Sequence, residues 1–484
     1  MSNIKQSLVS LFKPVDLTKG KPLKVILIFM VPILISLIFQ QIYTISDAAI
    51  VGNTLSTNEV AGVNVSYSLI FIVLQFAFGC TAGFSVVTSN KMGENNLEGV
   101  RKSFACQILV SFIISVILTI IAILCIPYLL NFIGIDSTHA DYKYAYDYIF
   151  IIYLGLICQV FYNLIVSVLR SVGDSLTPLL FLIGSTILNI GLDFLFICAF
   201  KMGVSGAAIA TVIAQFIAAL ACFIYSFIRY DFLRIKLNDF KLSWKFVIEH
   251  LKLGLPMAFQ FSILAIGLII LQKAVVKFDV NGLEDAKNGY GAAVKFNDFL
   301  MTPLNALGTA MLSYAGQNYG SKDVDRLKKG IKTSFILMLC LYAGLAVIGC
   351  LCSIGGAYVY IFLSADKIND RVVFYASTYM IVDSLMYFSL GGLFLIRNIL
   401  QGLGKSIYPL LSGITELIGR ILICEFLPQL INPANPISDA SFIGLCFADS
   451  MAWILAVCVM SYGIIYYIIR GKISNEFTSV ANTK

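Results

Sequence analysis

Residues 176–200 read LTPLLFLIGSTILNIGLDFLFICAF, an apolar stretch interrupted by one amide and one carboxylate. A helix needs ~20 mostly apolar residues to cross the ~30 Å hydrocarbon core of a bilayer, so this stretch predicts a membrane span. Asn189 and Asp193 are four residues apart, which places both side chains on one helix face. A carboxylate at membrane depth costs ~2.5–3.5 kcal/mol on insertion scales. Asp193 is therefore a candidate functional residue that needs partners.

The composition indicates that such spans recur along the whole chain. Of its 484 residues, 59% are hydrophobic and 13% are charged, which is too little charge for a soluble protein of this size. Short polar loops separate the apolar runs and leave no room for a soluble domain. We therefore predict an all-α polytopic membrane protein with about twelve spans. These lie at roughly 25–51, 61–89, 104–133, 146–169, 176–200, 204–229, 246–276, 290–316, 333–363, 375–399, 407–430 and 441–469.

The distribution of charge predicts the orientation. The net charge of +7 resides in loops rather than in a patch or motif, so it does not indicate a nucleic-acid partner. With an even number of spans both termini share a side, and the N-terminal lysines and three basic loops fall on that side. The positive-inside rule then places both termini in the cytoplasm of a multi-pass plasma-membrane protein. The polar N-terminus lacks a signal-peptide pattern.

Cysteine usage indicates neither disulfides nor zinc. The twelve cysteines include no CxxC motif and lie mostly inside the predicted spans. They are typical of small apolar packing residues. We expect no cofactor apart from a coupling ion.

The chain contains an internal repeat. The loop at 90–98, NKMGENNLE, returns at 317–325 as QNYGSKDVD, about 227 residues later. The segment GDSLTPLL at 173–180 returns at 404–411 as GKSIYPLL. Several matches at a nearly constant offset indicate two related halves.

Each half carries six of the predicted spans. Pro32 in the first span corresponds to Pro256 in the seventh. We predict an N-terminal six-helix lobe at 1–235 and a C-terminal lobe at 236–484. Because six is even, both halves insert the same way up, which makes the repeat parallel and places binding at or between the halves.

Four polar residues fall at similar depth in the outer half of the N-terminal lobe, counting ~1.5 Å per residue. Asp47 lies near the outer end of the first span, Asn189 and Asp193 lie in the fifth, and Thr211 lies in the sixth. Oxygen ligands of this kind suit a small hard cation such as Na⁺. They equally suit H⁺, since neighbouring carboxylates in a low dielectric exchange a proton near neutral pH. The alternative is that each group only hydrogen-bonds to a neighbour.

The equivalent positions in the C-terminal lobe differ. Asn189 and Asp193 map to Arg420 and Cys424, and Glu416 lies one turn before Arg420. Glu416 and Arg420 can pair on one helix face, either to neutralise each other or to handle substrate. If they only neutralise each other, replacing either one costs ~3–5 kcal/mol and replacing both restores stability.

Three weaker candidates complete the set. Gln41 lies in the first span, Gln260 in the seventh and Asp383 in the tenth. Asp383 is near the outer end of its span, where we expect water to solvate it.

These features together resemble the multidrug and toxin extrusion (MATE) transporters of the MOP superfamily over essentially all of residues 24–470. The resemblance rests on the two six-span halves, the paired loops around Gly93 and Gly320, RSVGDSLTP at 170–178, QGLGKSIYP at 401–409, and Asp47. It implies a V-shaped pair of bundles that exports amphipathic, often cationic drugs or toxins by alternating access. Na⁺ or H⁺ would enter in exchange.

The resemblance also implies roles for individual residues. DinF-like members carry an Asp in the first span, an Asn and an Asp four apart in the fifth, and a Thr in the sixth. These match Asp47, Asn189, Asp193 and Thr211, which would be metal ligands if the coupling ion is Na⁺.

One part of the family pattern is missing. NorM-like members carry a Glu in the seventh span and an Asp in the tenth. Leu264 stands where that Glu is expected, and Asp383 lies about two turns from the expected Asp. We therefore expect no C-terminal Na⁺ site of that type.

The sequence predicts a cation-coupled antiporter with a small amphipathic or cationic substrate, membrane lipid as its surroundings, and a monomeric state. A lipid-linked oligosaccharide flippase of the same superfamily is the alternative, although it matches the fifth-span acids less well. An enzyme is not expected, because the chain has no HExxH motif, no Ser/His/Asp set and only two His. A channel would need no acid buried in one lobe.

Overall fold

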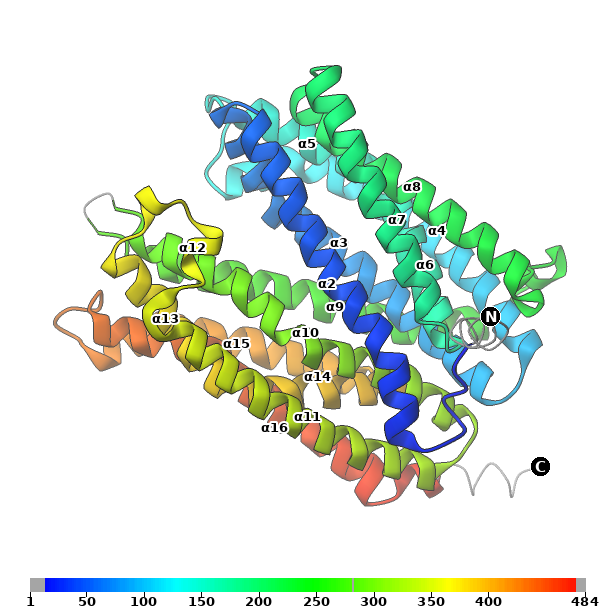
Figure 1. Cartoon of the computed structure of the whole chain (residues 1–484). Coiled ribbons are helices and arrows are strands. Elements are labelled where there is room, and N and C mark those ends of the chain that lie inside the picture. The colour runs from blue at the N-terminus through cyan, green and yellow to red at the C-terminus, as the bar shows by residue number, and fades with distance from the viewer. Residues whose placement is uncertain (1–13, 281–282, 476–484) are drawn as a thin grey trace, which may run out of the picture. The chain divides into compact units, whose positions relative to one another are not determined.

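The structure, a computed structural model, describes residues 14–280 and 283–475 as helices joined by short loops (Figure 1). Within these ranges eight helices are long and apolar enough to cross a membrane, and two bent helix pairs each form one further span. α10 and α15, with 36 and 25 residues, are also long enough to cross. The prediction of an all-α membrane fold with twelve spans is confirmed.

Both halves of the chain follow the same order of helices. The first half contains α2 (Pro22–Thr54), α3 (Thr57–Gly93), α4 (Leu97–Phe132), α5 (Tyr142–Leu154), α6 (Leu156–Ser171), α7 (Leu176–Asp193), η1 (Phe194–Ala199) and α8 (Gly203–Arg229). The second half contains α9 (Trp244–Val276), α10 (Asp285–Gly320), α11 (Val324–Ser353), α12 (Val359–Phe362), α13 (Asp370–Leu385), α14 (Tyr387–Gly402), α15 (Ile407–Ile431), α16 (Asp439–Ile464) and η6 (Ile465–Ile469).

Two predicted spans are broken helices. The span predicted at 146–169 consists of α5 and α6, bent by 47° at Gly155, where an added Cβ would collide with Val212 of α8. The span predicted at 375–399 consists of α13 and α14, bent by 55° at Met386. No Gly or Pro stands within four residues of Met386, so the sequence gives no sign of the second break.

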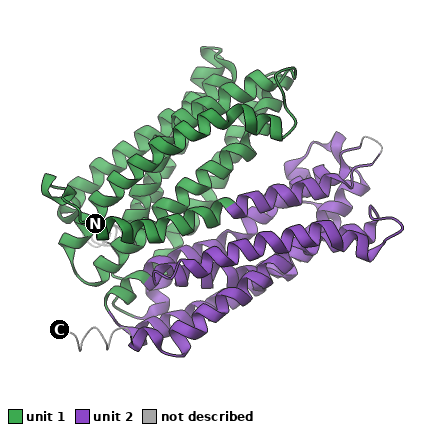
Figure 2. Cartoon of the chain, turned by 180° about the vertical axis from the view of Figure 1, so that it is seen from behind, with its two compact units in different colours: residues 1–20, 27–262, 316–321 green, residues 21–26, 263–315, 322–484 purple. Residues whose placement is uncertain are grey.

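The chain forms two compact units, coloured separately in Figure 2. Of the described residues, unit 1 contains 14–20, 27–262 and 316–321, and unit 2 contains 21–26, 263–280, 283–315 and 322–475. The first half of α9 and the last turn of α10 therefore pack with unit 1, although both belong to the second half of the repeat. Packing and sequence repeat divide the chain at different places.

Small residues explain why α9 packs against α3 within unit 1. A Cβ added at Gly79 would lie 2.6 Å from Ala258 Cα, and one at Gly83 would lie 2.5 Å from Gly254 Cα. Glycine and alanine let two membrane helices approach this closely.

The ends of α3 and α10 cross inside unit 1, and we call this contact the glycine crossing. A Cβ added at Gly93 would collide with the carbonyl oxygen of Gln317, and one at Gly320 would collide with that of Asn90. The two contacts are equivalent under the internal repeat. Only glycine fits at either position without moving backbone.

The turns that follow the glycine crossing are also equivalent. Asn95 and Lys322 both adopt positive φ, at 55° and 60°. The next residues, Asn96 and Asp323, cap α4 and α11 by accepting hydrogen bonds from the third backbone N–H beyond them.

Hydrogen bonds attach the segment before α2 to the glycine crossing. Leu17 is fully buried, its N–H donates to Gln317 Oε1 at 3.3 Å, and its carbonyl accepts from Asn318 Nδ2 at 3.1 Å. Val15 N–H donates to the carbonyl of Gly173 at 2.9 Å. These bonds connect the N-terminal segment to the loop after α6 and to the end of α10.

The linker between the halves is fixed to α4. Asp239 lies in a short 3₁₀ helix and accepts a hydrogen bond from Arg101 Nε at 2.6 Å. Burial alone would raise the pKa of Asp239, but the bonds from Arg101 and from the Lys236 N–H outweigh burial and lower it.

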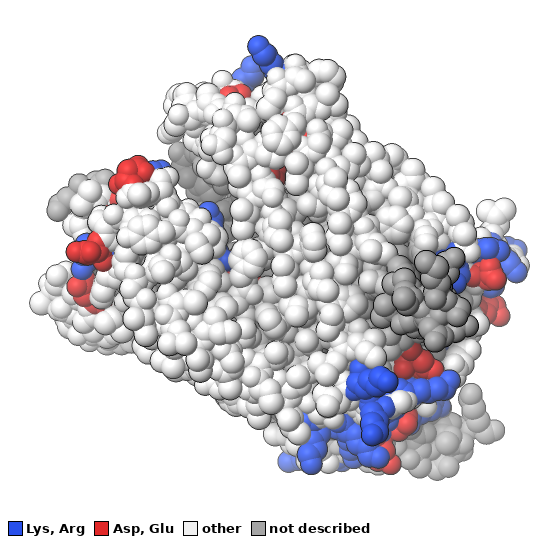
Figure 3. All heavy atoms as spheres, viewed as in Figure 1, with Lys and Arg blue, Asp and Glu red and all other residues white. Residues whose placement is uncertain are grey.

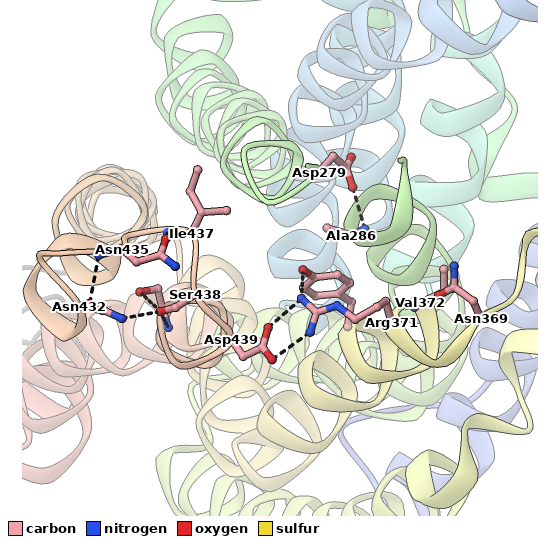
Figure 4. Close-up of polar contacts among 12 residues, drawn as sticks. Asp279, Ala286, Asn369, Arg371, Val372, Asn432, Asn435, Ile437, Ser438 and Asp439 are labelled. Atoms are coloured by element: carbon pink, nitrogen blue, oxygen red, sulfur yellow. Dashed lines mark hydrogen bonds and ion pairs between the residues drawn. The ribbon is translucent and has the colours of Figure 1, made fainter. Parts of the chain in front are cut away.

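In unit 2, ion pairing joins the start of α13 to the start of α16 (Figure 4). Arg371 approaches both oxygens of Asp439, at 2.7 and 2.9 Å, and stacks on the Tyr375 ring. Asn369 and Ser438 cap the two helices. This fork-like contact fixes the helix starts relative to each other.

Candidate functional site

The polar face of α7 is completely buried in unit 1. Asn189 and Asp193 have no exposed surface, and they lie one turn apart on one face, as predicted. Directly after Asp193, within the span predicted at 176–200, the helix changes to a π-helix, Phe194–Ala199. Single π turns inside helices frequently occur at functional sites.

Two neighbouring helices bring tyrosines to the predicted partners. Asp47 on α2 is 5% exposed, and its Oδ2 accepts a hydrogen bond of 2.9 Å from the Tyr67 hydroxyl on α3. The Tyr43 hydroxyl on α2 donates to Thr211 Oγ1 on α8 at 3.4 Å. Asp47 and Asp193 lie close enough to interact electrostatically, and Tyr43 lies close to both. We use the name N-terminal polar cluster for six residues: Asp47, Asn189, Asp193, Thr211, Tyr43 and Tyr67.

Within the part of the chain that the structure describes, four side-chain oxygens of this cluster are buried without a hydrogen-bond partner. The unpartnered atoms are Asp47 Oδ1, both side-chain polar atoms of Asn189 and both carboxylate oxygens of Asp193. Buried polar groups in proteins are usually hydrogen-bonded, because an unmade bond costs the desolvation free energy of the group. A group of four such oxygens fits a bound cation or proton.

The donor chemistry limits what the cluster can hold. Among the described residues, no three His, Cys, Asp or Glu side chains gather as a transition-metal site would require. The cluster instead offers carboxylate and amide oxygens with a hydroxyl nearby, which suits a hard cation such as Na⁺ or else H⁺.

Sequence reasoning missed both tyrosines. Tyr43 precedes Asp47 by one helical turn, so the spacing alone could have identified it. Tyr67 comes from another helix, and only packing reveals its bond. The weaker candidate Gln41 is half-buried on α2, and Gln260 is fully buried on α9.

In unit 2, Glu416 and Arg420 pair as predicted but belong to a longer series of contacts, which we call the charge chain. Glu416 Oε1 lies 2.9 Å from Arg420 Nη2, and Glu416 Oε2 lies 2.9 Å from Arg397 Nη2. Arg420 Nε lies 2.6 Å from Asp449 Oδ1, and the Tyr379 hydroxyl donates to Asp449 Oδ2 at 2.8 Å.

The charge chain alternates in sign and its four ionic groups sum to zero. All four side chains are at most 4% exposed. Sequence reasoning missed Arg397 and Asp449, although both are charges inside apolar runs, a signal that identifies buried partners. The pair that was predicted therefore has further partners at both ends.

The prediction that water solvates Asp383 is wrong. Asp383 on α13 is 0% exposed, and its Oδ2 accepts a hydrogen bond from Asn297 Nδ2 at 3.0 Å. The Tyr387 hydroxyl in turn donates to Asn297 Oδ1. The break after α13 changes the path of this span, so that a residue near its end in sequence lies inside unit 2.

Comparison with protein families gives two matches to one profile. The profile of the MatE family matches residues 32–195 and again residues 256–424. One profile that matches twice is the expected result for a chain with an internal repeat.

Curated relatives and a solved structure agree with this profile. The chain is 28% identical over 64% of its length to the probable multidrug resistance protein YpnP of Bacillus subtilis (strain 168), and spans 67% of it. It is 24% identical over 81% of its length to the probable multidrug resistance protein YoeA of the same organism, and spans 84% of it. A solved structure of a multidrug resistance MATE family transporter of the MOP superfamily, in an outward-facing conformation, aligns with TM-score 0.82 and 20% identity. The alignment covers 96% of this chain and 98% of the other.

Proposed function

Because the chain belongs to the MatE family, we propose that it exports small amphipathic or cationic compounds in exchange for Na⁺ or H⁺. Membership makes it a multi-pass membrane transporter and not an enzyme. The substrate class follows the relatives, which are named for multidrug resistance. The observation that carries cation coupling is the set of unpartnered oxygens in the N-terminal polar cluster.

The cluster needs positive charge to be stable when it is dry. An ionised carboxylate buried without a partner is unfavourable, and neither oxygen of Asp193 has a partner among the described residues. Asp47 has one hydrogen bond, from Tyr67, and lies within electrostatic range of Asp193. A proton on one acid, or Na⁺ held by oxygens of both, removes this cost.

Coupling follows if the cation binds one conformation more tightly than another. The cluster draws its oxygens from separate helices: Asp47 from α2, Asn189 and Asp193 from α7, and Thr211 from α8. A bound cation holds these helices together. Its release leaves unpaired charge that favours an opened and hydrated arrangement, so cation exchange changes helix packing.

Alternating access gives the glycine crossing a mechanical role. In an alternating-access cycle the ends of α3 and α10 separate and rejoin. The joined state depends on Gly93 and Gly320, because each lets the backbones touch. The stability of the glycine crossing therefore determines how often the cycle reaches the joined state.

We expect Gly93→Ala and Gly320→Ala each to slow transport several-fold, because the new methyl group collides with a backbone carbonyl and favours separated helix ends. Spin labels at Lys91 and Tyr319 would measure the separation as a shift toward longer distances. Gly344→Ala on α11 is the matched control, since nothing lies within 4 Å of its added Cβ. Unchanged distances and transport in both crossing variants would rule out this role of the glycine crossing.

The proposed orientation places both termini in the cytoplasm of a plasma-membrane protein. Tags at Ser2 and Lys484 should be inaccessible in intact cells, whereas a cysteine at Asn281 should react with an impermeant reagent. All three positions lie outside the described residues. External labelling of either terminus would reverse the depths assigned to Asp47 and Asp193.

A lipid-linked oligosaccharide flippase is not favoured. The relatives are named for multidrug resistance, and the N-terminal polar cluster presents acids to a cation rather than a surface for a sugar phosphate. We propose that the chain acts as a monomer. The direct test of the proposed function is ion-gradient-driven transport by the purified chain.

A further inference from the structure

Unit 2 carries an apolar groove of about 650 Å³ between α11, α14 and α16. From α11 come Phe335, Met338 and Tyr342, spaced three and four apart so that they form one stripe on the helix. Phe388 and Gly392 of α14 lie opposite, close to the break between α13 and α14. Among the described residues, no Lys, Arg, Asp or Glu lines the groove.

The groove is about as long as one leaflet of a bilayer. Along α16 and into the first residue of η6 its lining runs from Ile454 to Ile465, which is roughly 16 Å at 1.5 Å per residue. This is about half of the ~30 Å hydrocarbon thickness that these spans cross. The length suits a hydrocarbon chain that enters from one membrane surface.

Tyrosines gather at one end of the groove. Tyr462 and Tyr466 stack with ring centroids 6.2 Å apart, and Tyr467 packs edge-on to Tyr466 and to Tyr408. Lys405 Nζ lies 4.4 Å from the centre of the Tyr467 ring. Such tyrosine belts occur at headgroup level.

Basic residues surround this same end. Lys328 and Lys332 precede Phe335 by seven and three residues, so both lie on the groove side of α11, and both are exposed. Arg470 and Lys472 follow the last groove residue of α16. Figure 3 shows Lys and Arg gathered at the lower edge of the view, where Figure 1 draws the starts of α2 and α11, while the surface over the helices is almost uncharged.

We propose that this groove binds one anionic phospholipid, with an acyl chain between α11, α14 and α16 and the headgroup phosphate beside Lys328 and Lys332. The uncharged lining accepts hydrocarbon, and the basic rim attracts the phosphate. A cationic transported compound is disfavoured here, because the rim would repel it. Because the α13–α14 break lies at the inner end of the groove, the bound lipid would stabilise this bend.

Native mass spectrometry of the full chain, titrated with phosphatidylglycerol or phosphatidylcholine of matched acyl chains, tests the proposal. We expect one phosphatidylglycerol to bind about tenfold or more tightly than phosphatidylcholine. Lys328→Ala/Lys332→Ala should remove this preference, whereas the control Lys241→Ala/Lys245→Ala, at basic positions outside the groove, should keep it. Equal binding of both lipids to the unaltered chain would mean that the groove contacts bilayer lipid without headgroup preference, and would overturn the proposal.

Filling the groove tests the acyl-chain part. Gly392 lines the groove, and a Cβ added there meets only Val457, at 3.8 Å, so we expect the larger side chain of Gly392→Leu to occupy part of the groove. It should remove the tight phosphatidylglycerol, whereas Gly344→Leu, at an open position on α11, should not. Unchanged tight binding in Gly392→Leu would contradict the assigned location.

The unaltered chain offers a test that does not depend on folding of a variant. Cys458 lines the groove, and Cys340 is exposed on α11 outside it. Phosphatidylglycerol should slow alkylation of Cys458 several-fold and leave Cys340 unaffected, as peptide mapping would measure. Equal rates at Cys458 with and without the lipid would place the lipid elsewhere.

Discussion

Asp193→Asn should reduce gradient-driven export to background, at least a hundredfold, while the chain still inserts and folds. The substitution keeps the size of the side chain but removes the charge that the coupling cation neutralises. In the unaltered chain both Asp193 oxygens are buried without a partner, so an amide there loses no hydrogen bond within the protein. Stability should therefore stay the same or rise. Transport in proteoliposomes and thermal unfolding of the same preparation measure the two effects separately.

Two further variants make this result specific. Asn189→Ala removes one neutral ligand and should weaken the apparent cation affinity several-fold without abolishing transport. Asp366→Asn is the matched control, because Asp366 is an exposed acid in a loop between spans. Full gradient-driven export by Asp193→Asn would remove the N-terminal polar cluster from the mechanism.

The second large effect concerns the charge chain in unit 2. Glu416→Leu or Arg420→Leu should each destabilise the protein by ~3–5 kcal/mol, because each leaves a buried opposite charge without its partner. The sequence alone predicted that the double variant Glu416→Leu/Arg420→Leu recovers this loss. The contacts with Arg397 and Asp449 change that expectation, since the double variant leaves one charge unpaired at each end.

A different double variant should recover stability. Arg397→Leu/Glu416→Leu removes one complete pair and leaves Arg420 with Asp449 at 2.6 Å. We expect it to unfold at a higher temperature than Glu416→Leu/Arg420→Leu, which has the same number of substitutions. If the two doubles are equally stable, the four groups do not act as alternating pairs. Export by the recovered double then shows whether Arg397 and Glu416 have any role beyond neutralisation.

The sequence predicted the N-terminal polar cluster better than the charge chain, for a physical reason. Asn189 and Asp193 are one helical turn apart, and this spacing places them on one face in any α-helix. Depth along a span is also local information, and it grouped with them Asp47, which lies within electrostatic range of Asp193. Which oxygens lack partners depends instead on Tyr67 and on packing between helices.

The features that were missed are of two kinds. Arg397 and Asp449 are charges within apolar runs, and the rule applied to Asp193 identifies them too. The break at Met386 has no such signal in the sequence. Because of this break, Asp383 is buried inside unit 2 instead of lying at a solvated helix end. Gly93 and Gly320 match in the sequence repeat, but the requirement for glycine at both positions depends on the crossing of two backbones, which the sequence does not show.

The proposed function requires that a cation gradient drives export. The most direct measurement is uptake of a fluorescent cationic compound into proteoliposomes that contain only the purified chain, with Na⁺ and H⁺ gradients imposed separately. We predict concentrative transport under one of the two gradients, lost when an ionophore for that ion dissipates it and absent from Asp193→Asn. Transport at the same rate with neither gradient present would contradict the account.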